Sequence, residues 1–182
     1  MVESWPKFAL KELPQRVELA RTQNKYVFIN DLQGNCDSYF KVSGRIKAQF
    51  LEFGRIMTSA EGVQEEIDDG IEMLRAKWVV SMRLGQPLVL NMQKSEVCFA
   101  SYAAHPLFPC EVLFDSEQGR KPENYLKIVK EEENRDIFGN ERFEMKPEFM
   151  LIVLSTHTSD EKAEAMFNSL PSSEKFEKFV IQ

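Results

Sequence analysis

Residues 155–157, Ser-Thr-His, directly follow the most apolar run of the chain, residues 149–154. Such a run predicts a central strand, and in open α/β sheets ligands bind beyond the carboxyl ends of the strands. The three polar side chains could therefore contact a phosphate group or a water molecule. We favour the simpler interpretation that they form hydrogen bonds at the strand end, and that Thr158 or Ser159 begins the next helix.

The chain has no phosphate-binding loop of the form G-x-x-x-x-G-K-[ST]. The chemistry of that loop needs glycines, which let backbone N–H groups wrap the phosphates, and a lysine that neutralises the γ charge. The turn after the apolar run 26–29 carries one glycine, Gly34, between Asp31 and Asp37. Carboxylates at these positions would repel a triphosphate. We therefore predict a structural turn between a strand and a helix, and no ATPase activity.

The carboxylate that would hold Mg²⁺ at the end of a second apolar run is also missing. Residues 88–90 are followed by Asn91 and a methionine, and Glu96 comes later in a different register. A hydrolase of this class needs an acidic group there to position the metal ion and the attacking water. We expect no catalytic residues. If a nucleotide nevertheless binds without hydrolysis, the residues expected to contact it are Gly34, Asn91 and Thr156.

The cysteines and histidines do not suggest a reactive or metal-binding centre. Cys36, Cys98 and Cys110 contain no C-x-x-C pair, and the chain has only two histidines. This pattern is typical of buried thiols in a reducing compartment, and it predicts no metal site and no cofactor. Cys98 and His105 lie seven residues apart in a predicted loop, which favours an incidental thiol over a Cys–His pair. A small-molecule enzyme using Cys98 or His157 is the least supported alternative.

The element with the clearest pattern is a long amphipathic helix. Thr58 and Glu61 have the spacing of a capping box, and Gly85 is a residue type that ends helices. Acidic residues gather in the first half of the helix and basic residues in the second, which complements the helix dipole. Apolar residues recur at steps of three and four: Val63, Ile67, Ile71, Leu74, Trp78 and Met82.

The remaining segments predict alternating strands and helices. Strands are expected at 26–29, 88–90, 149–154 and 179–181, with a further strand at 50–53 or 55–57 and a strand or extended segment at 108–114. Helices are expected at 15–22, from 37 or 38 onward, at 122–133 and from 159 or 160 to 168, with turns at Leu13-Pro14 and at 137–140. The acidic run 131–133 is expected to be a solvated helix face. A helix that leads through a tight turn into an apolar strand is typical of a parallel sheet covered on both faces. We therefore predict an α/β three-layer sandwich with a mainly parallel sheet.

Length and charge limit the class of protein. The 182 residues suit a single domain, 1–182, in which residues 1–24 form an N-terminal extension packed on the core. The formal net charge of −6 disfavours binding to nucleic acid and to an anionic membrane surface. No secretory signal and no apolar stretch long enough for a membrane span is visible, so we expect a cytoplasmic protein.

Several of these segments follow one another as in a known family. Leu13-Pro14 precedes residues 25–36, Lys-Tyr-Val-Phe-Ile-Asn-Asp-Leu-Gln-Gly-Asn-Cys, and Tyr-Phe-Lys follows at 39–41. This is similar to the fifth AAA module of the dynein heavy chain, where a Leu-Pro is followed by a strand, an Asp-Pro-Gln-Gly-Gln-Ala turn and a Trp-Ile-Lys helix. Residues 83–91 resemble that module's helix, glycine, strand and asparagine. Residues 149–156 and 179–181 resemble its later strands.

The resemblance implies an AAA, or P-loop NTPase-like, core without the helical lid and with a structural role, because that dynein module has lost hydrolysis. By association it implies a ciliary, axonemal or other microtubule-associated assembly, with protein partners such as tubulin or axonemal proteins. The chain departs from the family at Leu32, Asn35 and Met92-Gln93, where the family has Pro, Gln and a Glu. Residues 93–120 have no counterpart. The alternative function is a module that binds nucleotide without hydrolysing it.

Overall fold

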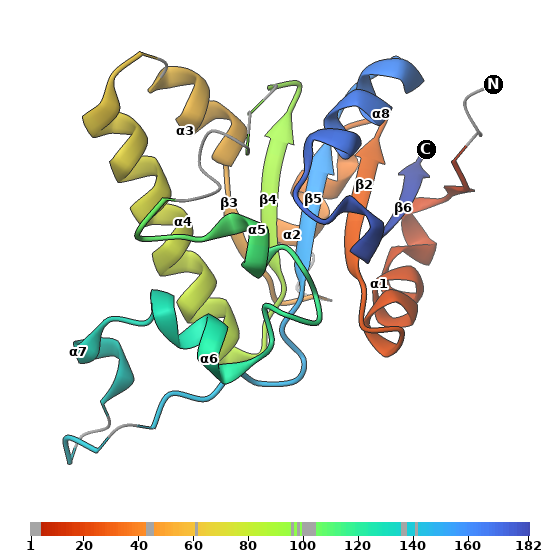
Figure 1. Cartoon of the computed structure of the whole chain (residues 1–182). Coiled ribbons are helices and arrows are strands. Elements are labelled where there is room, and N and C mark those ends of the chain that lie inside the picture. Colours follow the sequence, from red (N-terminus) through yellow and green to blue (C-terminus); the bar gives the residue numbers. More distant parts are fainter. Residues whose placement is uncertain are drawn as a thin grey trace.

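The structure, a computed structural model, describes residues 5–42, 46–60, 62–95, 97, 99, 105–135, 138–140 and 142–182. Its centre is a six-stranded sheet in the order β1-β6-β2-β5-β4-β3, and every strand pair is parallel. Helices cover both faces of the sheet (Figure 1). The predicted α/β three-layer sandwich is therefore confirmed. The strands are β1 (Lys7–Phe8), β2 (Tyr26–Asp31), β3 (Gln49–Leu51), β4 (Leu88–Gln93), β5 (Leu151–Ser155) and β6 (Phe176–Ile181).

The two central strands, β2 and β5, are buried along their whole length. Their register pairs Val27 with Ile152 and Ile29 with Leu154. Continuous apolar runs form such strands because both faces lie under helices, so no position alternates to solvent. This is why the apolar patterns at 26–29 and 149–154 correctly predicted strands in the middle of the sheet.

The helices divide between the two faces according to the direction in which the chain crosses the sheet. Right-handed crossovers place α1 and α2 on one face, and α3, α4 and α8 on the other. Tyr26 packs against Trp78 of α4, with ring centroids 6.4 Å apart, and Phe28 packs against Phe167 of α8 at 5.5 Å. These helices are α1 (Leu13–Thr22), α2 (Asn35–Val42), α3 (Phe53–Ser59), α4 (Gln64–Leu84) and α8 (Asp160–Ser169).

The N-terminal segment extends the sheet as well as covering it. β1 pairs with β6, with Lys7 opposite Val180. After the 3-10 turn η1 (Leu10–Glu12), Pro14 stands in the first turn of α1, so the turn predicted at Leu13-Pro14 is wrong. A proline fits there because the first N–H groups of a helix need no partner inside it. Leu13, Val17 and Ala20 of α1 are buried in the core.

The start of the long helix differs from the prediction, while its end agrees. Thr58 lies inside α3 and its hydroxyl donates to the Gly54 carbonyl at 2.8 Å, so it does not cap α4. Glu61, the other half of the predicted capping box, lies outside the described residues. The N-cap of α4 is Val63, which is 46% exposed and so does not belong to the buried stripe. Gly85 ends α4 in the left-handed conformation (φ 67°), as predicted.

The segment predicted as a strand or extended segment at 108–114 instead contains a short helix, α5 (Cys110–Leu113). Its backbone bonds are local, from Leu113 N to Pro109 O at 3.2 Å and from Phe114 N to Cys110 O at 3.0 Å. Phe108 and Phe114 pack on Trp78, with ring centroids at 5.1 and 5.7 Å. The apolar run is therefore buried over α4 and does not join the sheet.

The helix predicted at 122–133 is broken into α6 (Pro122–Tyr125), a 3-10 turn η3 (Leu126–Ile128) and α7 (Glu131–Asn134). The break surrounds Arg75 of α4, which is only 3% exposed. The guanidinium donates to the Ile128 carbonyl at 2.7 Å and to both carboxylate oxygens of Glu133 at 2.7 and 3.0 Å. The acidic run 131–133 is therefore not only a solvated face, because Glu133 fixes this segment to α4.

Three further boundaries complete the fold. The alternative strand at 55–57 lies inside α3, and the strand of that region is β3. The predicted turn at 137–140 is described only from Phe138, and Gly139 has a positive φ of 80° there. A 3-10 turn η4 (Ser173–Lys175) leads from α8 into β6.

None of the helices within the described ranges is long and apolar enough to cross a membrane.

Candidate functional site at the carboxyl edge of the sheet

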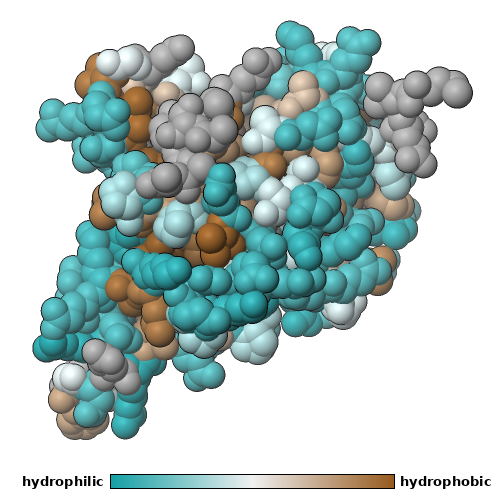
Figure 2. Space-filling view, in the orientation of Figure 1, coloured by the Kyte–Doolittle hydropathy of each residue, from teal (hydrophilic) through white to brown (hydrophobic). Residues whose placement is uncertain are grey.

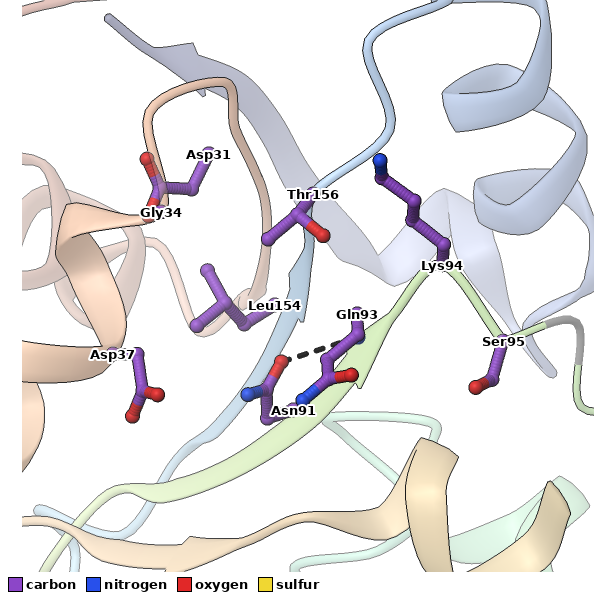
Figure 3. Close-up of a pocket in the computed structure, with 9 residues that line it drawn as sticks. All are labelled: Asp31, Gly34, Asp37, Asn91, Gln93, Lys94, Ser95, Leu154 and Thr156. Carbon is purple, nitrogen blue, oxygen red and sulfur yellow. Dashed lines mark hydrogen bonds between the residues drawn. The ribbon is translucent and has the colours of Figure 1, made fainter.

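The neighbouring strands β2 and β5 send the chain to opposite faces of the sheet. β2 continues through α2 toward β3, whereas β5 continues through α8 toward β6. Such a point opens a crevice beyond the carboxyl ends of the strands, and this is where ligands of α/β sheets bind. A cavity of about 430 Å³ lies here (Figure 3), and it is lined by Asp31, Gly34, Asp37, Asn91, Gln93, Lys94, Ser95, Leu154 and Thr156.

All three residues predicted to contact a nucleotide line this one cavity. Gly34 belongs to the turn between β2 and α2, Asn91 lies near the end of β4, and Thr156 follows β5. They come from segments far apart in the sequence, and the parallel sheet brings them together because its carboxyl ends share one edge. The structure thus supplies the geometry that the prediction required. Nucleotide binding itself stays a prediction.

The fully buried carboxylate of Asp31 holds the β2–α2 turn from the inside. One oxygen accepts a hydrogen bond from the Gln33 N–H at 3.2 Å, and the other accepts from the Cys36 N–H at 2.6 Å. The Leu32 N–H donates to the Ile181 carbonyl of β6 at 3.0 Å. Three amides around Gly34 are therefore already used inside the protein. In a phosphate-binding turn such amides face the ligand.

Cys36 is the second residue of α2, and its side chain is fully buried. Burial raises its pKa, and the nearby carboxylate of Asp31 raises it further. A cysteine at a helix start is often reactive because the dipole favours its thiolate. Here the surroundings keep the thiol protonated, so Cys36 is not a candidate nucleophile.

Glu52, which follows β3, links the two sides of the crevice. Its carboxylate accepts hydrogen bonds from the Asn91 side chain at 2.9 Å and from the Gln93 side chain at 3.3 Å, and it pairs with Lys41 at 2.6 Å. Lys41 also pairs with Asp37 at 2.7 Å. Burial opposes the charge of Lys41, but its bonds to Asp37 and Glu52 outweigh burial and raise its pKa. These side chains thus form one connected polar network beside the cavity, with two carboxylates and one cation.

The end of β4 has an irregular backbone that turns polar groups toward the cavity. Gln93 adopts a positive φ of 54°, and the pairing with β5 shifts register between Asn91 and Gln93. The Asn91 side-chain oxygen accepts from the Gln93 N–H at 3.1 Å, and the Gln93 carbonyl accepts from the Thr156 N–H at 2.9 Å. Figure 3 shows Asn91 and Gln93 side by side, with Thr156 just beyond the end of the neighbouring strand β5. These bonds fix the relative positions of the two strand ends.

Of the polar segment 155–157, only Thr156 lines the cavity. Ser155 is fully buried, and its hydroxyl accepts a 3.4 Å bond from the His157 N–H. His157 is 4% exposed, and its carbonyl accepts from the Asn30 side chain at 2.9 Å. The segment therefore mainly completes hydrogen bonding at the strand end. This agrees with the expected hydrogen bonding at the strand end. Ser159 is the N-cap of α8, as expected, but its side chain makes no capping hydrogen bond.

The other candidates from the sequence lie elsewhere. Cys98 lies outside the described residues, so the Cys98–His105 pair is not described. His105 contacts Asp68 of α4 at 3.3 Å. Within the described ranges, no group of three or more histidine, cysteine or acidic side chains could hold a metal ion.

Sequence reasoning missed Glu52, Gln93, Lys94 and Ser95 as residues of this edge. Glu52 lies 39 positions from Asn91, and its strand was ambiguous in the sequence, so no local pattern placed it near the site. The available signal was its position: a polar residue directly after a strand of a parallel sheet must lie at the carboxyl edge. Asp31 was recognised, but as a group that repels a ligand and not as one that fills the turn.

Comparisons with protein-family models, with curated proteins and with solved structures found no match for this chain.

Proposed function

We propose that this protein is a non-catalytic domain with a degenerate AAA-like core, and that it acts through contacts with other proteins. The observation that supports this most is the Asp31 carboxylate on the Gln33 and Cys36 amides. A negatively charged group occupies the donors that a phosphate would need, and it also repels one. The lining of the cavity adds a single cationic side chain, Lys94, which does not compensate for the missing P-loop.

The strand order supports an AAA-like origin. If β2 to β6 are numbered one to five along the chain, the sheet reads 5-1-4-3-2, with β1 added beside the fifth strand. This is the order of AAA-type ATPase cores, and in them the nucleotide lies at the turn after the first strand. The same turn here is the one that contains Asp31 and Gly34. The support is an analogy at the level of the fold, so the function has to be tested directly.

An assay of ATP hydrolysis by the purified protein directly tests the proposal that the domain is not catalytic. We expect no Mg²⁺-dependent release of phosphate from ATP above the level of a Thr156→Ala variant. Thr156 contributes a hydroxyl to the cavity lining at the end of the central strand β5, so its loss should abolish any genuine activity of this site. Hydrolysis by the wild type that the variant lacks would show that the proposal is wrong.

A place in a ciliary, axonemal or other microtubule-associated assembly, with tubulin or axonemal proteins as partners, rests on the dynein resemblance alone. The test is the position of the tagged protein in ciliated cells. Concentration along the axoneme supports this part of the proposal. A diffuse cytoplasmic distribution would remove it and leave the non-catalytic core unaffected.

The second candidate function is binding of a nucleotide without hydrolysis. It is favoured by one observation, the meeting of Gly34, Asn91 and Thr156 at one cavity of about 430 Å³. A thermal-shift titration with ATP, ADP, GDP and adenosine tests it, because a ligand at 100 times its Kd stabilises the fold by about 2.7 kcal/mol. Stabilisation that Asn91→Ala abolishes supports binding in the cavity. No shift at millimolar nucleotide removes this candidate.

A further inference from the structure

β1 is attached to the sheet more loosely than the other strands of the described chain. Residues 5–8, which include β1, contain no buried residue, whereas each of the other five strands contributes at least one residue to the core. Only two residue pairs join β1 to β6, compared with six between β6 and β2. The Val180 N–H donates to the Pro6 carbonyl at 2.9 Å, and the Gln182 N–H donates to the Phe8 carbonyl at 3.1 Å. Short, exposed elements with few bonds open at a low cost in free energy.

Trp5 covers aromatic side chains of β2 and α8. Its ring packs edge-on against Phe28 and Phe167, with centroids 5.5 and 5.7 Å apart. The indole N–H donates to the Glu164 carboxylate at 2.5 Å. The ammonium of Lys178 lies 5.0 Å from the centroid of the indole and pairs with Glu164 at 3.1 Å. Apolar rings, an acceptor for the indole N–H and a cation over the ring together form a slot that suits an indole.

Phe8 makes its contacts on the opposite face of the sheet. Its ring lies 5.6 Å from that of Phe179, and the Arg16 guanidinium lies 3.7 Å from its centroid. Lys178 and Phe179 are successive residues of one strand, so their side chains point to opposite faces. Residues 5–8 therefore contact both faces at the edge of β6 with an aromatic-x-x-aromatic pattern. Figure 1 shows this red segment beside β6, and Figure 2 shows a mostly hydrophilic surface along that margin of the molecule.

We propose that residues 5–8 are a latch that opens locally, and that the uncovered edge of β6 binds an extended aromatic-x-x-aromatic segment of a partner protein. The inference rests on the proposed function, because it names the surface through which the domain contacts another protein. The seated segment itself argues for this occupant. A partner strand that pairs with β6 and donates an indole N–H to Glu164 would repeat its contacts. The latch then competes with the partner for one site.

Hydrogen exchange of the full chain tests the local opening. The Val180 N–H faces β1, whereas the polar backbone groups of Phe179 and Ile181 face β2, because successive residues alternate. We expect the Val180 amide to exchange at least about tenfold faster than these two neighbours, after correction for intrinsic rates. Trp5→Ala should speed exchange at Val180 alone. Leu19→Ala, at an exposed position of α1, is the control and should change none of the three rates.

A peptide supplied in trans tests the docking site. The probe is a labelled peptide, capped at both ends, with the sequence of residues 5–10, Trp-Pro-Lys-Phe-Ala-Leu. Because the chain's own Trp5 competes with it, the peptide should bind Trp5→Ala at least about tenfold more tightly than the wild type, as measured by fluorescence anisotropy. An alanine in place of the tryptophan of the peptide should remove this binding. Glu164→Gln, added to Trp5→Ala, should weaken it, since the acceptor of the indole N–H loses its charge.

Three results would overturn the inference: equal exchange rates at the three amides of the wild type, no binding of the peptide to Trp5→Ala, or equal binding to Trp5→Ala and the wild type. The exchange comparison uses the wild type, and circular dichroism checks the folding of the variants. ATP hydrolysis by the wild type would contradict the proposed function without affecting the latch. An inert latch would leave the non-catalytic core untouched, so the two failures are distinguishable.

Discussion

The backbone N–H of Cys36 donates a 2.6 Å hydrogen bond to the carboxylate of Asp31, five residues earlier and fully buried. The bond satisfies a helix-start amide within the chain itself. A negative group at this position also complements the positive end of the dipole of α2. The amides of this turn therefore have hydrogen-bond acceptors without any ligand. In a phosphate-binding turn, by contrast, such amides donate to the phosphate.

Replacing Asp31 with alanine should destabilise the protein and free the turn. Two amides lose a charged acceptor, so we expect a loss of about 1 to 3 kcal/mol in the free energy of unfolding. Inorganic phosphate or pyrophosphate should then raise the melting temperature of Asp31→Ala but not that of the wild type. Urea unfolding and thermal-shift titration measure the two effects.

The control for Asp31→Ala is Asp37→Ala, which also removes a carboxylate from the cavity lining. Its carboxylate pairs with Lys41, whereas the Gln33 and Cys36 amides of the turn donate to Asp31, so the variant should gain no response to phosphate. An equal gain in both variants would mean that net charge alone, and not the freed amides, governs anion binding.

Gly54 of α3 should tolerate no side chain. A Cβ built there would lie 2.2 Å from the Met92 carbonyl oxygen of β4, a backbone atom that cannot move aside. We expect Gly54→Ala to lower the free energy of unfolding by about 2 kcal/mol or more, as in overpacked cores. Gly34→Ala is the comparison, since no atom lies within 4 Å and only its positive φ opposes a side chain. That strain costs about 1 kcal/mol, so Gly34→Ala should be the milder variant in urea denaturation.

Arg75 should be among the most sensitive charged positions. Arg75→Met keeps the buried aliphatic volume but removes the guanidinium that donates to the Ile128 carbonyl and to Glu133, whose carboxylate keeps the Lys130 N–H. Breaking one partner of a buried ion pair costs about 3 kcal/mol. Arg21→Met is the control, because the Arg21–Glu18 pair is exposed and such pairs contribute less than about 1 kcal/mol. Equal midpoints of urea unfolding for the two variants would contradict this role for Arg75.

The same cluster should make stability depend on acid. Its hydrogen bond with Arg75 lowers the pKa of Glu72 from 4.5 to about 2, against the opposing effect of burial. Burial alone would raise the pKa of Glu133, but its bonds to Arg75 and Lys130 reverse this and lower it. A lowered pKa in the folded state stabilises the fold above the unfolded value, so this contribution is lost as pH falls from about 5 to about 2. Arg75→Met should flatten the dependence of the unfolding free energy on pH in this window, and an unchanged slope would argue against it.

Sequence patterns predicted those elements whose signal is local. The strands at 26–29 and 149–154 followed from apolar runs, and Gly85 marked a helix end because its left-handed conformation suits glycine. The presence of Gly34, Asn91 and Thr156 at one edge followed from the geometry of parallel sheets, once their strands were recognised.

The errors came from segments whose conformation depends on distant partners. Residues 108–114 have the composition of a strand, but packing on Trp78 favours a helical turn. The predicted helix at 122–133 is interrupted because Arg75 donates hydrogen bonds to the Ile128 carbonyl and to the Glu133 carboxylate. Glu52 lacked any local signal, since its importance arises only when β3 pairs with β4.

The pairing of Lys7 with Val180 joins two positions separated by nearly the whole chain. β6 pairs with both β1 and β2. Until β6 has been synthesised, β1 has no partner strand and one edge of β2 is unpaired. A fold dominated by such distant pairings has a high contact order, and this slows folding because loop entropy is lost before the contacts form. The protein should therefore refold slowly.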